Sequence, residues 1–202
     1  MKRLGTFSTL PRIALIAVAV GVVPVAFALV SGGDSVASTT QYTIEEAIAF
    51  HDAAKEGDSD ATAKAVEAFK SLTQAHETDP LAVVYLGSSY AMTARDAGSV
   101  TDKIRFTNRG LRYLDQAVTM APDDFVVRLV RANVISNLPA MFGRDEMVVD
   151  DMIWLDRAYT AAHNPRMAAP MARIYSELNA RAPERGDWQA KLSAVKSIVA
   201  GN

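Results

Sequence analysis

The sequence predicts an all-α protein made of antiparallel helical hairpins stacked on one another, and three observations lead to this fold class. Apolar residues recur at helical spacing from Thr43 onward, which is the pattern of helices that bury one face. In this part of the sequence no five residues alternate cleanly between apolar and polar, as a half-buried strand would require. Clusters of glycine, proline and aspartate interrupt the apolar pattern and mark the turns.

The composition is that of one folded domain and argues against several functional classes. Half of the 202 residues are apolar and 22% are charged, which is enough apolar surface for a core. The first 28 residues hold three basic residues and no acidic one, so the remainder has 18 basic and 23 acidic residues, a net charge of minus five. Such a charge does not favour a phosphate backbone, and we expect no nucleic-acid partner. The absence of cysteine excludes disulfides, thiolate metal sites and cysteine nucleophiles.

Residues 1–30 are predicted to form a signal peptide or a membrane anchor. Residues 13–30 form a run of 18 apolar and small residues. Three basic residues precede this run, namely Lys2, Arg3 and Arg12. This run is near the lower limit of about 17 to 25 residues for a spanning helix. The basic residues would hold the amino terminus in the cytoplasm. Residues 31–42 are small, polar and glycine-bearing, and they are predicted to be a flexible linker.

The same apolar run also has the features of a cleaved export signal. Ala26 and Ala28 supply the two small residues that signal peptidase requires, and Pro24 would end the helix just before the cut. The pattern favours cleavage over a retained anchor and leaves both open. Either outcome delivers the chain from Ser31 onward outside the cytoplasm. We therefore expect the protein in the periplasm or on the outer side of the inner membrane.

Residues 43–202 are predicted to form one domain of eight helices in four hairpins. The first helices of the hairpins are expected at about 44–55, 81–95, 124–138 and 167–181. The second helices are predicted from apolar stripes within 65–75, 106–121, 148–162 and 188–199. Gly57 is expected to end the first helix, with one of residues 58–60 capping the next, and Asp79 with Pro80 marks the turn into the second hairpin.

The second hairpin resembles a known repeat. Leu86, Gly87 and Tyr90 match the Leu-Gly-x-x-Tyr pattern of a first helix, and Ala117 with Pro122 matches the end of a second helix. These residues resemble the tetratricopeptide repeat (TPR), a helical hairpin of about 34 residues. The chain is similar to exported bacterial members of that family, including, weakly, the accessory component of some tripartite solute transporters. The resemblance implies a short TPR-like solenoid whose first helices line a groove for a protein partner.

Several positions depart from the repeat. The spacing between Gly87 and Ala117 is longer than in the standard unit, which predicts extra residues within 94–106. A second long link is expected over 137–145. Arg131 stands where the repeat has leucine, and Gly110 stands where it has alanine. We expect the geometry of the stack to differ at these joints.

The resemblance also places residues on the groove. Eight side chains are predicted to line it: Val84, Ser88, Met92, Leu129, Asn133, Asn137, Arg173 and Glu177. Amides both donate and accept while guanidinium donates in a fork, so these polar groups suit a peptide backbone or a carboxylate. The alternative is that these side chains are polar only because they face solvent. In the link that follows, Met141 and Phe142 are expected either to tuck under the loop or to anchor a partner.

The sequence shows no set of residues that names a reaction. His51, His76 and His163 have no second histidine or cysteine at ligand spacing, so we expect neither a metal nor a cofactor. Glu146 and Asp150 lie one turn apart and would suit acid–base chemistry only if one were buried. The sequence therefore predicts a non-enzymatic scaffold or assembly subunit of the bacterial cell envelope, with protein partners and a membrane complex as one candidate. The alternative is an accessory solute-binding component of an envelope transporter.

Overall fold

The computed structural model describes residues 42–76 and 79–201, which belong to one compact unit. Within these two ranges all regular structure is helical, which confirms the predicted fold class. The eight α-helices of the described residues are α1 Ile44–Lys55, α2 Ser59–Ala75, α3 Pro80–Asp96, α4 Val100–Met120, α5 Phe125–Ser136, α6 Asp145–Ala162, α7 Ala168–Arg181 and α8 Trp188–Ala200. None of these helices combines the length and the hydropathy needed to cross a membrane. The predicted signal or anchor at 1–30 lies outside the described residues, as does the predicted linker apart from Tyr42.

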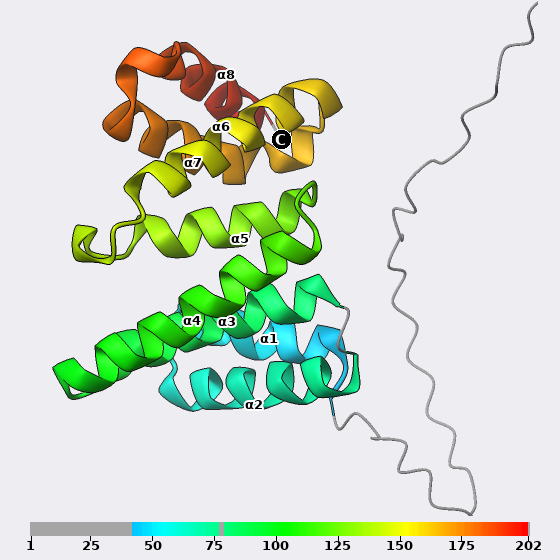
Figure 1. The fold of residues 1–202 in the computed structure, drawn as a ribbon. Coiled ribbons are helices and arrows are strands. Elements are labelled where there is room, and N and C mark those ends of the chain that lie inside the picture. Colours follow the sequence, from blue (N-terminus) through cyan, green and yellow to red (C-terminus); the bar gives the residue numbers. More distant parts are fainter. Residues whose placement is uncertain (1–41, 77–78, 202) are drawn as a thin grey trace, which may run out of the picture. The chain divides into compact units, whose positions relative to one another are not determined.

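Consecutive helices pair into four hairpins, α1 with α2, α3 with α4, α5 with α6 and α7 with α8 (Figure 1). Each second helix also packs against the first helix of the next hairpin, because α2 contacts α3, α4 contacts α5 and α6 contacts α7. First helices touch as well, α1 with α3 and α3 with α5. The apolar stripe of each hairpin is thus covered by its neighbour, which is the reason such units are stable only when stacked.

The helix ends follow the predicted turn chemistry. Gly57 adopts the left-handed conformation, with φ of 98°, immediately after α1. Asp58 caps α2, and its Oδ1 accepts hydrogen bonds from the next backbone N–H groups at 2.9 and 3.0 Å. Asp79 caps α3 in the same way, with Pro80 at the first helical position. Each cap contributes about 1 kcal/mol of stability.

The crossing of α3 and α4 depends on two glycines. A β-carbon added at Gly87 would lie 2.9 Å from the Gly110 carbonyl oxygen, and one added at Gly110 would lie 2.7 Å from the Gly87 carbonyl oxygen. Both distances are shorter than a carbon–oxygen contact tolerates, so each glycine permits the close approach. Tyr90 and Tyr113 stack beside the crossing, with ring centroids 5.7 Å apart. The departure at Gly110 from the alanine of the repeat therefore has a packing reason.

The extra residues predicted within 94–106 do not form a long loop. Helix α3 runs on to Asp96 and α4 begins at Val100, so only residues 97–99 link them. The Ser99 hydroxyl oxygen accepts a hydrogen bond from the Asp102 N–H at 3.0 Å and starts α4 early. The insertion is thus absorbed as helix. The second long link is present, and it contains a short 3₁₀ turn, Ala140–Phe142, followed by Gly143 with φ of 64°.

The core runs through all four hairpins. One cluster of buried side chains joins α3 to α8, and its fully buried members include Leu114, Leu155 and Met171. A second cluster joins α1, α2 and α3 around Phe69. Burial of a large apolar side chain stabilises the fold by about 1.5–3 kcal/mol. The helices that carry the predicted groove are therefore held on a packed scaffold.

Candidate functional site

The predicted groove residues of the third and fourth hairpins come together in a polar row between α5 and α7. Arg173 Nη2 donates to Asn137 Oδ1 at 3.0 Å. Arg181, which was not predicted, donates from Nη2 to the Ser136 carbonyl oxygen at 3.0 Å. We call this set the α5–α7 row, and it consists of Asn133, Ser136, Asn137, Arg173, Glu177 and Arg181. Arg181 follows Glu177 by four residues, and that helical ion-pair spacing was the signal in the sequence that could have found it.

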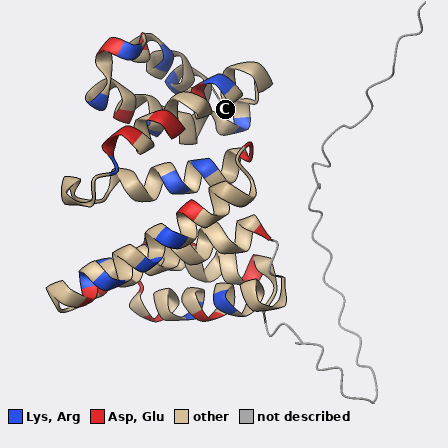
Figure 2. Cartoon of the chain, viewed as in Figure 1, with Lys and Arg blue, Asp and Glu red and all other residues tan. Residues whose placement is uncertain are grey.

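The α5–α7 row offers both signs of charge and amide groups to a partner. Arg173 and Asn137 are exposed. Arg181 donates from Nε to Glu177 Oε2 at 2.9 Å and from Nη1 to Asp145 Oδ1 at 3.1 Å. Figure 2 shows basic positions on α5 and acidic positions gathered toward the start of α6. A guanidinium carries five N–H donors, so Arg173 can hold Asn137 and still bind a carboxylate or a carbonyl oxygen.

The other two predicted α5 residues lie deeper. Asn133 is half-buried, and its carbonyl oxygen accepts from Asn137 Nδ2 at 2.6 Å. Its Oδ1 is buried without a hydrogen-bond partner among the described residues. Leu129 is half-buried and packs against the larger core cluster. Asn133 is therefore a half-buried member of the row, while Leu129 takes part in packing α5 against the core.

The predicted groove residues of α3 are not on an open face. Val84, Ser88 and Met92 are only 0%, 6% and 9% exposed. The Ser88 hydroxyl is hydrogen bonded to His51 Nε2 of α1 at 2.8 Å, and Met92 clusters with Ala54 of α1. Helix α1 lies against α3 and covers Ser88 and Met92, whereas Val84 is buried in the larger core cluster. Counting from Gly87 located the right helix but could not show that a neighbouring helix covers this face.

His51 is the buried titratable group of this region. Its exposed fraction is 4%. Burial, followed by the charge of Lys55, lowers the pKa of His51 to about 4, against a smaller opposing effect of Asp52. Its Nδ1 lies 3.8 Å from Asp52 Oδ1 and makes no hydrogen bond among the described residues. Ser88, His51 and Asp52 are residues of the types found in a nucleophile, base and acid triad. Ser88 and His51 are buried, however, and their hydrogen bond links α3 to α1.

The loop candidates separate into one tucked and one exposed residue. Phe142 is half-buried and packs against the larger core cluster. Met141 is 74% exposed. Of the two residues of this 3₁₀ turn, Met141 is therefore the one exposed enough to contact a partner.

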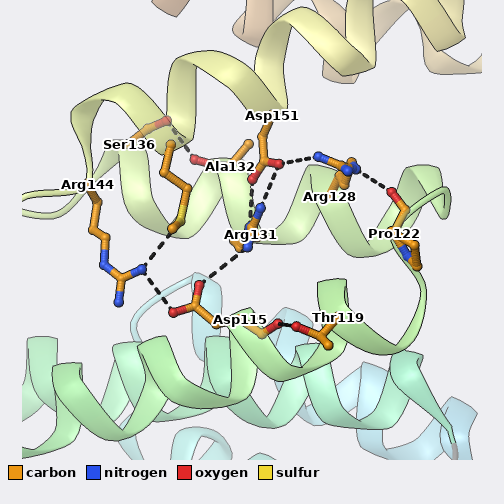
Figure 3. A network of polar contacts seen from close by, with 10 residues as sticks. Asp115, Thr119, Pro122, Arg128, Arg131, Ala132, Ser136, Arg144 and Asp151 are labelled. Atoms are coloured by element: carbon orange, nitrogen blue, oxygen red, sulfur yellow. Dashed lines mark hydrogen bonds and ion pairs between the residues drawn. The ribbon is translucent and has the colours of Figure 1, made fainter.

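Arg131, at the leucine position of the repeat, is part of a buried ion-pair network (Figure 3). Its Nε and Nη2 donate to the two oxygens of Asp151 at 2.7 and 2.8 Å. Arg128 Nη1 donates to the same carboxylate at 2.7 Å. Asp115 extends the network, at 3.3 Å from Arg131 Nη1 and 2.9 Å from Arg144 Nη1. The network ties α4, α5 and α6 together, and Asp151 belongs to the structure and not to an open site.

The carboxylate pair considered for acid–base work is exposed. The side chains of Glu146 and Asp150 are 94% and 68% exposed, and both face Arg185, at 3.8 and 3.4 Å. Neither carboxyl lies in the buried, water-excluded environment that general acid catalysis requires. Within residues 42–76 and 79–201, no three carboxylate or histidine side chains gather in an arrangement that could hold a metal ion.

The paired helices, the stacking of second helix on next first helix, and the glycine-mediated crossing together make this fold TPR-like. No protein-family model matches the chain, and no curated protein matches its sequence. Among solved structures, the chain is similar to a thermophilic TPR protein of Thermus thermophilus at 16% identity, with a TM-score of 0.45. That match covers 74% of this chain and 88% of the Thermus chain.

Proposed function

We propose that this protein is a non-enzymatic scaffold or assembly subunit that binds a protein partner through the α5–α7 row. The observation that carries the proposal is the convergence of exposed Asn137 and Arg173 with Glu177 and Arg181 across two first helices. A stacked helical fold holds these groups on rigid elements, which lowers the entropy lost on binding.

The chemistry of the row favours an extended peptide segment that carries a carboxylate. Arg173 supplies fork-shaped donors, while Asn137 both donates and accepts, as a peptide backbone requires. Met141 follows Asn137 by four residues and is exposed, so it adds an apolar contact at the end of α5. The net charge of minus five on the chain beyond its first 28 residues gives no support to a nucleic-acid partner.

We place this function in the cell envelope, outside the cytoplasm. The support is the sequence of residues 1–30, where three basic residues precede the uncharged run 13–30. A cleaved signal would release the protein to the periplasm, and a retained helix would hold it at the outer side of the inner membrane in reach of a membrane complex. Sequencing the amino terminus of the native protein distinguishes the two.

The proposal is tested by quantitative capture of partners from the envelope fraction. Wild type and Arg173→Ala are compared with Arg112→Ala, which removes an exposed arginine of α4. Loss of a charge-assisted contact weakens binding by about tenfold or more. A partner that is depleted with Arg173→Ala and retained with Arg112→Ala supports the row. Equal recovery with all three proteins contradicts it.

One observation supports the second candidate, an accessory solute-binding component of an envelope transporter. A pocket of about 390 Å³ opens between α6, α7 and α8, away from the residues of the row. Pockets of this size hold small molecules in many proteins. A bound solute in the native protein, detected by native mass spectrometry, would favour this candidate.

A further inference from the structure

The pocket between α6, α7 and α8 has a mostly apolar wall and one polar end. Side chains from all three helices line it, among them Tyr159, His163, Tyr175, Lys191, Val195 and Ile198. Its volume of about 390 Å³ lies within the range of about 300–1,000 Å³ that is usual for small-molecule sites. Tyr175 and Val195 are buried and form its floor, while Ile198 is 38% exposed at its edge.

The polar end is built around Asp156. Lys191 Nζ hydrogen bonds to both carboxylate oxygens, at 2.7 Å to Oδ2, and the Tyr175 hydroxyl donates to Oδ1 at 2.9 Å. Burial and the bond to Asp156 raise the pKa of Tyr175, so its hydroxyl stays protonated as a donor. An ammonium has three N–H donors, and Asp156 takes two of those of Lys191. Lys191 lines the pocket with a side chain that is 39% exposed, and both of its hydrogen bonds among the described residues go to Asp156.

The choice of an anion rests on Lys191 itself. Asp156 is already paired with Lys191 and Tyr175, so it offers no free charge to a ligand. A ligand carboxylate can accept the hydrogen bond that the remaining N–H of Lys191 donates.

His163, which lines the pocket, occupies a helix-end position at which glycine would be more stable. It ends α6 in the left-handed conformation, with φ of 48° and ψ of 40°, and it is the one residue other than glycine with positive φ in the described ranges. Glycine is the usual residue there, because a β-carbon is unfavourable in this conformation. The imidazole lines the pocket, so its presence at a strained position is explained if it contacts a ligand.

We propose that this pocket binds a small amphipathic carboxylate. The ring or chain of the ligand packs against Tyr159, Val195 and Ile198, and its carboxylate accepts from Lys191 with His163 beside it. The pocket shares helix α7 with the α5–α7 row, but none of the row's residues lines it, so it neither requires nor excludes a protein partner there.

The test uses purified protein and three matched probes: 3-phenylpropionate, its uncharged amide, and phenylpropylamine as the cation. Binding is followed by NMR chemical-shift perturbation and by isothermal titration. We expect saturable binding of the carboxylate, with shifts that centre on α6, α7 and α8, and affinity for the amide and the amine that is about tenfold or more lower. Equal affinity for the three probes, shifts centred elsewhere, or no saturable binding of the carboxylate would overturn the proposal.

Variants separate ligand contact from a structural role. His163→Gly is expected to weaken carboxylate binding by about tenfold while the thermal midpoint stays the same or rises, because glycine relieves the left-handed position. Ile198→Ser is expected to weaken binding of the apolar body without unfolding the exposed edge of α8. Lys196→Met, an exposed lysine outside the pocket lining, is the matched control and should bind as wild type does. Unchanged binding in both His163→Gly and Ile198→Ser contradicts the site.

Discussion

Replacing Asp151 by asparagine is expected to destabilise the protein by about 3 kcal/mol, because it leaves buried arginine charge without its partner. The Asp151 carboxylate is 1% exposed and accepts three charge-assisted hydrogen bonds, two from Arg131 and one from Arg128. Asparagine keeps the shape but has no charge and one accepting oxygen. Arg131, with a side chain 10% exposed, then retains Asp115, at 3.3 Å, as its one charged partner among the described residues.

The magnitude follows from the burial of both partners. Removing one member of a buried ion pair costs about 3–5 kcal/mol, since the remaining charge is desolvated without compensation. The lower end applies here, because asparagine still accepts one bond and Arg128 can turn toward solvent from a side chain that is 18% exposed. The paired variant Arg131→Leu with Asp151→Asn restores the leucine of the repeat. It is expected to lose less stability than either single variant, with a coupling free energy of about 2 kcal/mol or more.

Urea denaturation followed by circular dichroism measures these free energies of unfolding for wild type, both single variants and the paired variant. Asp123→Asn, an exposed aspartate in the turn before α5, is the control and should change stability by less than about 0.5 kcal/mol. If Asp151→Asn costs no more than this control, or if the two single effects simply add, the network does not carry the energy assigned to it.

Three further outcomes follow from the structure. Gly110→Ala should destabilise by about 1–3 kcal/mol in the same denaturation assay, because its β-carbon meets a backbone oxygen, whereas Gly98→Ala, with nothing within 4 Å, should be near neutral. The pKa of His51 is about 4 in the folded chain and 6.5 in the unfolded one, so the unfolded chain binds the proton first as pH falls. The free energy of unfolding should therefore drop by up to about 3 kcal/mol as pH falls from 6.5 to 4. This drop is measured as the difference between wild type and His51→Gln, which titrates no group at this position; equal pH profiles would refute it. Met141→Ser should leave the thermal unfolding midpoint unchanged, whereas Phe142→Ala should lower it. The reverse result would mean that the Phe142 side chain does not pack against the core.

The helices and their ends could be predicted because they depend on local chemistry. Apolar spacing located all eight, and the stops at Gly57 and at Asp79 with Pro80 are set by neighbouring residues. The close approach at Gly87 was also predictable, because the repeat pattern implies a small residue at a helix crossing. These features require no knowledge of distant parts of the chain.

The rest depended on contacts between residues far apart in the sequence. Ser88 was expected in the groove, but His51, 37 residues earlier, covers and hydrogen bonds it. Arg131 was recognised as out of place, and its partner Asp151 lies 20 residues away on another helix. An arginine at a core position must find a buried acid, so the existence of a partner could be inferred but not its identity. The pocket between α6 and α8 needs the packing angle of three helices, which no local pattern gives.

Site-specific photocrosslinking tests whether these stacked hairpins present the α5–α7 row to a protein partner. A photoreactive residue replaces exposed Ser176, which lies on α7 between Arg173 and Glu177, and in a second protein it replaces exposed Gln116 on α4. In cells that make the protein, we expect one defined protein adduct from position 176 and none of that adduct from position 116. No adduct at position 176, or the same adduct at both positions, would contradict the account.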